Sequence, residues 1–209
     1  AAGALLLIAA TVMAGTAPGA SAQSTTTFQV TITNQSHPPS MMSPGAYLLH
    51  LQAGALWQSG QLASPEIERI AEGGDPTEAL TMPGSGMIGD APVVGDTTSF
   101  RVTAAPGMML SLAQMLIASN DAFVGVDSLA LFDGTTPRSL MIELTALDAG
   151  TEANSALGSG FAGGQPDPSE GAYNLNNGTA TNEAISAHTQ YVGVQATLSV
   201  TPLPNPAST

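Results

Sequence analysis

Phe28-Gln29-Val30-Thr31-Ile32-Thr33 is the stretch of this sequence that best indicates its fold. Apolar side chains alternate in it with polar ones, which is the period of a β-strand that buries one face. The same alternation returns near the other end of the chain, in Val194-Gln195-Ala196-Thr197-Leu198-Ser199-Val200. We therefore predict strands over residues 28–33 and 191–200, both within the sheets of one domain.

Short apolar runs of the same kind lie between these two segments, separated by stretches rich in Gly and Pro such as residues 82–95. They predict further strands at 46–51, 99–103, 108–117, 129–132 and 140–147. The Met and Leu content of residues 108–117 also suits a helix, and we interpret this run as a strand. About seven short strands divided by turns are typical of an all-β fold, an antiparallel β-sandwich.

One helix is marked in the sequence, by Ser64-Pro65-Glu66-Ile67-Glu68-Arg69-Ile70-Ala71-Glu72-Gly73-Gly74. Ser stands at the N-cap position, Pro stands in the first turn, and acidic residues lie near the positive end of the helix dipole. The two glycines end the helix. We expect Trp57 to pack near this helix rather than to serve as a ligand platform. Residues 158–177 have no periodicity and many Gly, Pro, Asn and Ser residues, so we expect a long surface loop or flap there.

The first residues have the composition of an export signal. An apolar run over residues 4–14 is too short to span a bilayer, and small residues follow it up to Ala20-Ser21-Ala22, a signal-peptide cleavage pattern. We predict a signal peptide over residues 1–22, clipped at its start because it lacks an initiator Met and basic residues, with Gln23 as the mature start. A domain over 23–200 and a Pro-rich tail over 201–209 follow. A buried hydrophobic helix is the alternative for the apolar run, whereas a signal peptide implies a secreted protein, whether extracellular, at the cell surface or periplasmic.

The chain of 209 residues carries 16 acidic side chains against 3 basic ones, all of them arginine, and its formal net charge is -13. Nucleic acid and anionic lipid both require a cationic surface, so we exclude them as partners, and we expect no membrane insertion of the mature chain. Cysteine is absent, so neither a disulfide framework nor thiol chemistry is available. The charge favours cations as ligands.

Two short acidic clusters follow apolar runs, at residues 119–125 (Ser-Asn-Asp-Ala-Phe-Val-Gly) and 147–154 (Leu-Asp-Ala-Gly-Thr-Glu-Ala-Asn). Carboxylates, amides and glycines in the loops of a sandwich can present oxygen ligands to a hard cation such as Ca²⁺. Simpler roles remain open: Asp121 as a turn cap, Asn154 as a partner for backbone groups, and Glu152 as a solvated side chain. The spacing of Asp148 and Glu152 would stack them on one helix face, but a tight loop around Gly150 fits a position after a strand better.

Four segments in this order resemble the spondin N-terminal domain family: Phe28-Gln29-Val30-Thr31-Ile32-Thr33-Asn34, residues 63–75, Ser119-Asn120-Asp121, and Asp148-Ala149-Gly150-Thr151-Glu152. The resemblance covers about residues 27–200. It implies a β-sandwich of C2-like topology with a Ca²⁺ site at one end, as found in animal extracellular-matrix adhesion proteins and in secreted bacterial proteins. Carried over residue by residue, the metal ligands would be Asp121, Asp148 and Glu152.

The chain departs from the animal members of that family at several points. They often have Asp where Glu152 stands, and this change keeps a carboxylate. They also have an aromatic residue directly after the first Asp, where this chain has Ala122 and then Phe123. Animal members carry cysteines, which this sequence lacks, and their adhesive role rests partly on attached domains. The resemblance therefore implies a secreted Ca²⁺-binding module more strongly than it implies adhesion.

Two common enzyme motifs are absent from the sequence. No serine has glycine two residues away on both sides, as a hydrolase nucleophile elbow requires, and no H-E-x-x-H zinc motif occurs. His37, His50 and His188 lie far apart, and we expect them at the surface or lightly buried. We therefore predict a non-enzymatic Ca²⁺-binding extracellular module, adhesive or associated with the matrix or cell surface, whose partner is an extracellular protein or glycan. The alternative is a secreted metal-assisted hydrolase that uses the same carboxylates.

Overall fold

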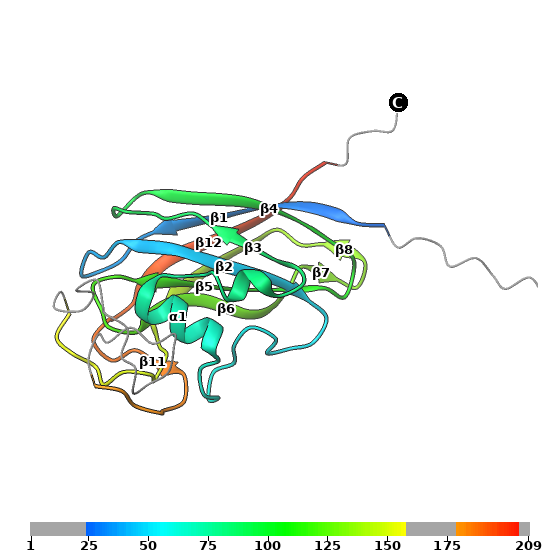
Figure 1. Ribbon diagram of the computed structural model, residues 1–209. Coiled ribbons are helices and arrows are strands. Elements are labelled where there is room, and N and C mark those ends of the chain that lie inside the picture. The colour runs from blue at the N-terminus through cyan, green and yellow to red at the C-terminus, as the bar shows by residue number, and fades with distance from the viewer. Residues whose placement is uncertain (1–23, 158–178, 205–209) are drawn as a thin grey trace, which may run out of the picture.

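A computed structural model of the chain describes residues 24–157 and 179–204 (Figure 1). The predicted signal peptide, the predicted loop over 158–177 and the last residues of the predicted tail lie outside the described residues. The described part consists mainly of two antiparallel sheets packed face to face, which confirms the predicted all-β sandwich. Within it, no helix is long and apolar enough to cross a bilayer.

The first sheet has the strand order β4-β1-β12-β9. Its strands are β1 (Thr26–Asn34), β4 (Thr97–Ala104), β9 (Leu140–Thr145) and β12 (Val194–Pro202). Both terminal strands lie within the sheets, as predicted, and the structure adds that they pair with each other at the centre of this sheet, with Val30 opposite Val200. The pairing continues to Phe28 opposite Pro202, so the last strand runs two residues past the predicted boundary at 200.

The second sheet has the strand order β11-β10-β6-β5-β2-β3. Its strands are β2 (Met42–His50), β3 (Ser85–Ile88), β5 (Met109–Leu116), β6 (Ala122–Ala130), β10 (Leu147–Asp148) and β11 (Ser186–Ala187). A small separate hairpin joins β7 (Phe132–Asp133) to β8 (Thr136–Pro137). The ambiguous run at 108–117 is a strand, as we interpreted it.

Three details of the predicted strand list are wrong. The sequence predicts an acidic loop at 119–125 and a strand at 129–132, whereas residues 122–130 form one long strand, β6. The stretch 82–95, predicted as a connection, contains β3. The predicted strand 140–147 divides at Ala146 into β9 and β10, which belong to different sheets. In each case tertiary pairing overrides the local composition.

The sandwich encloses one core between its sheets, and a second core lies under the helix. The first includes the buried side chains Phe28, Ile32, Leu112 and Leu198. The second lies where α1 (Pro65–Gly73) packs on the outer face of the second sheet, against β5 and β6 (Figure 1). It includes Ile67, Ile70, Phe123 and Trp57, whose ring meets the Phe123 ring edge-on at 5.3 Å between centroids. Trp57 is therefore a packing residue near the helix, as predicted.

The helix begins and ends where the sequence indicates, but not with the expected cap. Ser64 precedes the first turn in an extended conformation, and its side chain makes no capping hydrogen bond. At the other end Gly74 adopts a left-handed conformation (φ 62°), and its N–H donates to the Ile70 carbonyl at 2.9 Å. The left-handed region explains why glycine stands there. A single 3-10 turn, η1 (Ala79–Thr81), follows the helix.

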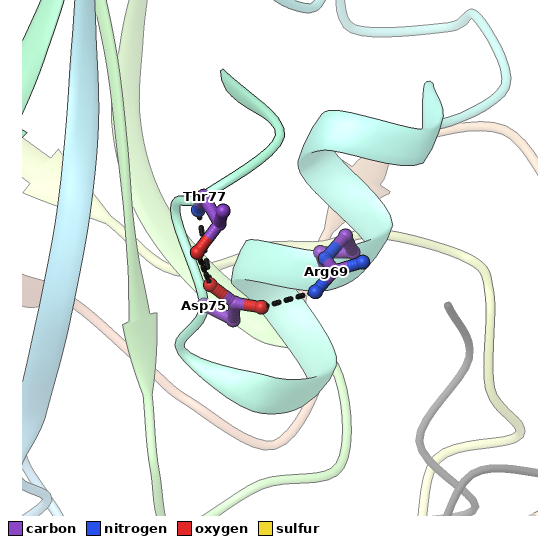
Figure 2. Close-up of polar contacts among 3 residues, drawn as sticks. All are labelled: Arg69, Asp75 and Thr77. Atoms are coloured by element: carbon purple, nitrogen blue, oxygen red, sulfur yellow. Dashed lines mark hydrogen bonds and ion pairs between the residues drawn. The ribbon is translucent and has the colours of Figure 1, made fainter. Parts of the chain in front are cut away.

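A polar turn fixes the segment that follows α1, and Figure 2 shows it. The Arg69 guanidinium donates to one carboxylate oxygen of Asp75, and the N–H and hydroxyl of Thr77 donate to the other. Burial by itself would raise the pKa of Asp75, but the hydrogen bonds from Thr77 and Arg69 outweigh it and lower that pKa below its usual value.

Candidate functional site

The two predicted acidic clusters meet at one end of the sandwich. Asp121 is the residue just before β6, and Asp148 is the last residue of β10. These strands pair, with Asp148 opposite Ala122. Asp121 is the residue before Ala122, so the two aspartates lie close together across the strand pair. The N–H of Ala149 also donates to the Asp121 carbonyl at 3.2 Å. Strand pairing thus brings together residues 27 positions apart in the sequence, from 121 to 148.

Asp121 is a buried carboxyl group whose two oxygens have different surroundings. Its side chain is fully buried. Oδ2 accepts hydrogen bonds from the backbone N–H groups of Thr151 and Glu152, each at 3.1 Å. Oδ1 is buried and has no hydrogen-bond partner within the described part of the chain. A buried carboxylate oxygen without a donor is costly, so this atom marks a place for a positive charge or a proton.

Asp148 is 9% exposed and holds the loop that follows it. Its Oδ1 accepts a hydrogen bond from the N–H of Gly150 at 2.8 Å, and its Oδ2 accepts one from the Asn154 side-chain amide. The Asn120 amide donates to the Ala153 carbonyl at 3.0 Å, which ties the first acidic loop to the second. The Asn154 side-chain amide therefore donates to the Asp148 carboxylate.

The segment after Asp148 is a loop, as predicted, and Gly150 is the residue that permits it. Gly150 adopts φ 72°, and a Cβ there would lie 2.5 Å from the Glu183 carbonyl oxygen. The carbonyl of Gly150 in turn accepts hydrogen bonds from the N–H of Glu183 and the hydroxyl of Thr181, each at 2.8 Å. Both the left-handed conformation and the close approach require glycine at this position.

The electrostatics of the pair are those of two carboxyl groups competing for one proton or cation. Burial raises the pKa of Asp121 most, the charge of Asp148 raises it further, and the hydrogen bonds from Glu152 and Thr151 lower it without cancelling the rise. The resulting pKa is about 7. Near neutral pH, a cation that displaced this proton would remove the repulsion between the two carboxylates and would give Oδ1 of Asp121 a partner.

Glu152, the third predicted ligand, belongs to the same loop and is 2% exposed. The hydrogen bond that it donates to Asp121 comes from its backbone N–H, and its segment forms an isolated bridge with Ala180. Within residues 24–157 and 179–204, no three His, Asp or Glu side chains are grouped as a preformed metal-ligand set. Asp121 and Asp148 thus form the pair at the site, and assigning the Glu152 carboxylate as a ligand stays a prediction.

Two histidines are more buried than we expected. His50 is 9% exposed and His188 is 5% exposed, so the expectation of surface or lightly buried positions is wrong for both. The N–H of His188 donates to the Ala146 carbonyl at 3.1 Å. In the pairing of β10 with β11, Asp148 lies opposite Ser186, so His188 is two residues along the chain from the position opposite Asp148. Residues two positions apart share a strand face, so His188 and Asp148 lie on one side of the sheet. Burial lowers the pKa of His188, and the Asp148 charge opposes that change.

A hydrogen-bonded serine and histidine that the sequence did not reveal lie elsewhere in the second sheet. His50 Nε2 is 2.8 Å from Ser111 Oγ, and the other ring nitrogen bonds the Gln52 carbonyl. The N–H of Ser128, which has an unusual φ of 54°, donates to Ser111 Oγ at 2.8 Å. The network lies at a β-bulge between β5 and β6. Ser111 is fully buried, so we interpret the network as a support for the bulge rather than as a nucleophile and base.

The family model described as Spondin_N matches residues 22–186, which is most of the chain and includes both acidic loops. No curated protein matches the chain.

Proposed function

Because the chain belongs to the spondin N-terminal domain family, we propose that it is a non-enzymatic extracellular binding module whose loop end binds one Ca²⁺ ion. The side-chain ligands in this proposal are Asp121, Asp148 and Glu152. The partner of the module is an extracellular protein or glycan, in an adhesive or matrix-associated role.

The observation that carries the proposal is the buried Oδ1 of Asp121, beside the carboxylate of Asp148 and without a donor in the described part of the chain. The sequence has only three basic residues, and one of them, Arg69, is paired with Asp75. A cation is therefore the natural complement to the acidic pair. Its ligands would be oxygens from two carboxylates, with backbone carbonyls and water available to complete the shell, and that donor set suits Ca²⁺.

Glu152 would join the site through a change of side-chain rotamer within its loop. Its backbone is already fixed beside Asp121 by the 3.1 Å hydrogen bond to Oδ2. Ca²⁺ tolerates irregular coordination of six to eight oxygens, so a third carboxylate would strengthen binding without being essential for it.

Burial favours a binding module over the hydrolase alternative. Asp121 is fully buried and Asp148 is 9% exposed, so a substrate could reach neither carboxylate unless the loop opened. A general acid or base must come within hydrogen-bond distance of the atom it serves. A cation held by buried carboxylates is instead suited to holding two loops together.

The experiment is thermal unfolding of the EDTA-treated protein with added Ca²⁺ or Mg²⁺, for the wild type and Asp148→Ala. Binding to the folded state at about 100 times Kd stabilises it by about 2.7 kcal/mol. For a domain of this size that corresponds to a rise in Tm of about 5 to 11 °C. Mg²⁺ should raise Tm much less, because it requires tighter octahedral geometry.

Asp148→Ala should lose most of the Ca²⁺ response. Its Tm in EDTA should stay near the wild-type value, because the loss of the hydrogen bonds from Gly150 and Asn154 is offset by removal of the charge repulsion with Asp121. Asp133→Ala is the matched control, because it removes an exposed aspartate in the β7–β8 hairpin. Equal Ca²⁺ responses of wild type and Asp148→Ala would show that the site is assigned wrongly.

A further inference from the structure

In the part of the chain that the structure describes, two strand edges on one side of the sandwich have no partner strand. β9 pairs with β12 and β6 pairs with β5, while β10 covers only Ala122 and Phe123 of β6. Within residues 24–157 and 179–204, no strand pairs with the outer edge of β9 or with the rest of β6. Such edges present unpaired N–H and C=O groups, which can pair with an added strand.

A cavity of about 340 Å³ lies between these two edges. Its apolar lining is Trp57, Val126, Leu129, Ile142, Leu144 and Leu147. These side chains come from both sheets and from the segment before the helix, so the cavity opens on the core at the side of the sandwich. We call this cavity and the two bare edges the side groove.

Trp57 is held rigidly in the wall of the side groove. Its indole N–H donates to the Leu112 carbonyl at 3.1 Å, and its ring packs edge-on against Phe123. Gly125 lies beneath it, and a Cβ at that position would lie 3.2 Å from the indole and 2.2 Å from the Leu112 carbonyl oxygen. The Trp57 ring is therefore ordered before a ligand binds, and this lowers the entropic cost of binding.

The charge of the side groove selects among possible occupants. Asp127 and Glu143 line it, and no basic side chain is among its lining residues. A second copy of the chain would bring another net charge of -13, and a register of two antiparallel β9 edges that placed Glu143 opposite Glu143 would be disfavoured. Like charges directly opposite on paired strands destabilise the pairing. A cationic partner would meet attraction at the same positions.

We propose that the side groove binds an extended peptide segment with alternating apolar and basic side chains, added as a strand along the edge of β9. Backbone hydrogen bonds to β9 would give affinity, apolar side chains would enter the cavity beside Trp57, and basic side chains would face Glu143 and Asp127. This inference does not depend on the Ca²⁺ proposal, because none of the three proposed metal ligands lines the cavity.

The test uses the fluorescence of Trp57, the single tryptophan of the chain. The full chain is titrated with an acetylated and amidated hexapeptide of alternating Val and Lys, in EDTA and again in Ca²⁺. A saturable change in emission is expected under both conditions. A peptide with Glu in place of Lys, and one with Pro in place of the central Val, should produce none, because the first has the wrong charge and the second cannot pair as a strand.

Glu143→Lys should weaken binding of the Val-Lys peptide by about tenfold, the effect of reversing one close charge contact. Asp90→Lys is the matched control, since it makes the same charge change at an exposed residue after β3, the strand at the opposite edge of the second sheet. The affinity of Asp90→Lys for the Val-Lys peptide should stay within about twofold of the wild-type affinity. If both variants weakened peptide binding equally, the effect would come from the net charge of the chain and not from Glu143, and the proposal would be overturned.

Absence of saturable binding, or equal binding of the Glu peptide, would also overturn the proposal. Sedimentation of Glu143→Gln without peptide provides a further check. A dimer in that experiment would identify a second copy as the occupant of the edge, whereas the proposal predicts a monomer.

Discussion

The backbone N–H of Glu152 donates a 3.1 Å hydrogen bond to Asp121 Oδ2, and so joins the second acidic loop to a fully buried carboxyl group of the first. Thr151 donates to the same oxygen at the same distance. One oxygen of Asp121 is thereby satisfied by the loop, and Oδ1 is left for a ligand or a proton. The second acidic loop is thus held beside Asp121 by backbone hydrogen bonds alone, as the proposed Ca²⁺ site requires.

The pH dependence of the metal-free protein should follow Asp121. The folded-state pKa of this group, about 7, lies above the ordinary aspartate value of 3.8, so the folded state binds more protons than the unfolded state between those values. Stability should therefore fall as pH rises from about 4 to about 8, by an amount on the order of a few kcal/mol. Urea unfolding in EDTA across this range measures the slope.

Asp121→Asn is the matching variant for this pH prediction. It removes the charge but keeps the carbonyl oxygen that accepts the two backbone hydrogen bonds. Its stability in EDTA should vary much less than that of the wild type between about pH 4 and pH 8, and it should exceed the wild-type stability at the upper end. Parallel pH profiles of the two proteins would contradict the assigned pKa.

Gly150→Ala should destabilise the protein by about 3 kcal/mol or more, because left-handed strain adds to a clash with the Glu183 carbonyl. Gly134→Ala is the control, since Gly134 also has positive φ (56°) but has nothing within 4 Å of the added Cβ. The control should show only the backbone strain, about 1 to 2 kcal/mol. Urea denaturation at fixed pH compares the two, and equal losses would mean that the loop yields to the clash.

Ser111→Ala tests the structural role of the buried network in the second sheet. It removes the partner of His50 Nε2 and of the Ser128 N–H, and should cost about 1 to 3 kcal/mol of stability. Ca²⁺ affinity should stay within about twofold of the wild type, because the network is separate from the acidic loops. Chemical denaturation and Ca²⁺ titration of the same variant give both values. A large loss of affinity with unchanged stability would contradict this assignment.

The turn in Figure 2 predicts an acid-sensitive contribution from Asp75. Its folded pKa lies below 3.8, so the stability that the charged form provides is present above that value and is lost as pH falls through the folded pKa. Asp75→Ala should cost about 1 kcal/mol near pH 7, since the ion pair is partly exposed and screened. The difference from the wild type should shrink below about pH 3. A difference independent of pH would mean that packing, not charge, explains the loss.

The terminal strands were predictable because each carries its own alternation, and burial of one face is a local property of the sequence. β6 was not, since Gly125, Asp127 and Ser128 are poor strand formers that are held in the sheet by pairing with β5. The division of 140–147 at Ala146 could not be predicted either, because the apolar pattern continues unbroken where the chain passes from one sheet to the other.

The acidic loops were predictable as a candidate cation site because carboxylates next to glycine after an apolar run form a local signal. The surroundings of that site were not predictable. His188 lies near Asp148 only through the pairing of β10 with β11, and the two residues are 40 positions apart in the sequence, from 148 to 188. The full burial of Asp121, which gives the pair its unusual electrostatics, likewise depends on tertiary packing.

Direct measurement of Ca²⁺ binding tests the central claim most closely. Equilibrium dialysis of the EDTA-treated chain against radioactive Ca²⁺ at pH 8 should show one ion per chain, with Kd on the order of 10⁻⁴ to 10⁻³ M. Asp121→Asn and Asp148→Ala should abolish saturable binding, while Asp133→Ala should bind as the wild type does. Absence of saturable binding to the wild type, or undiminished binding to both site variants, would contradict the proposal that these buried carboxylates hold Ca²⁺.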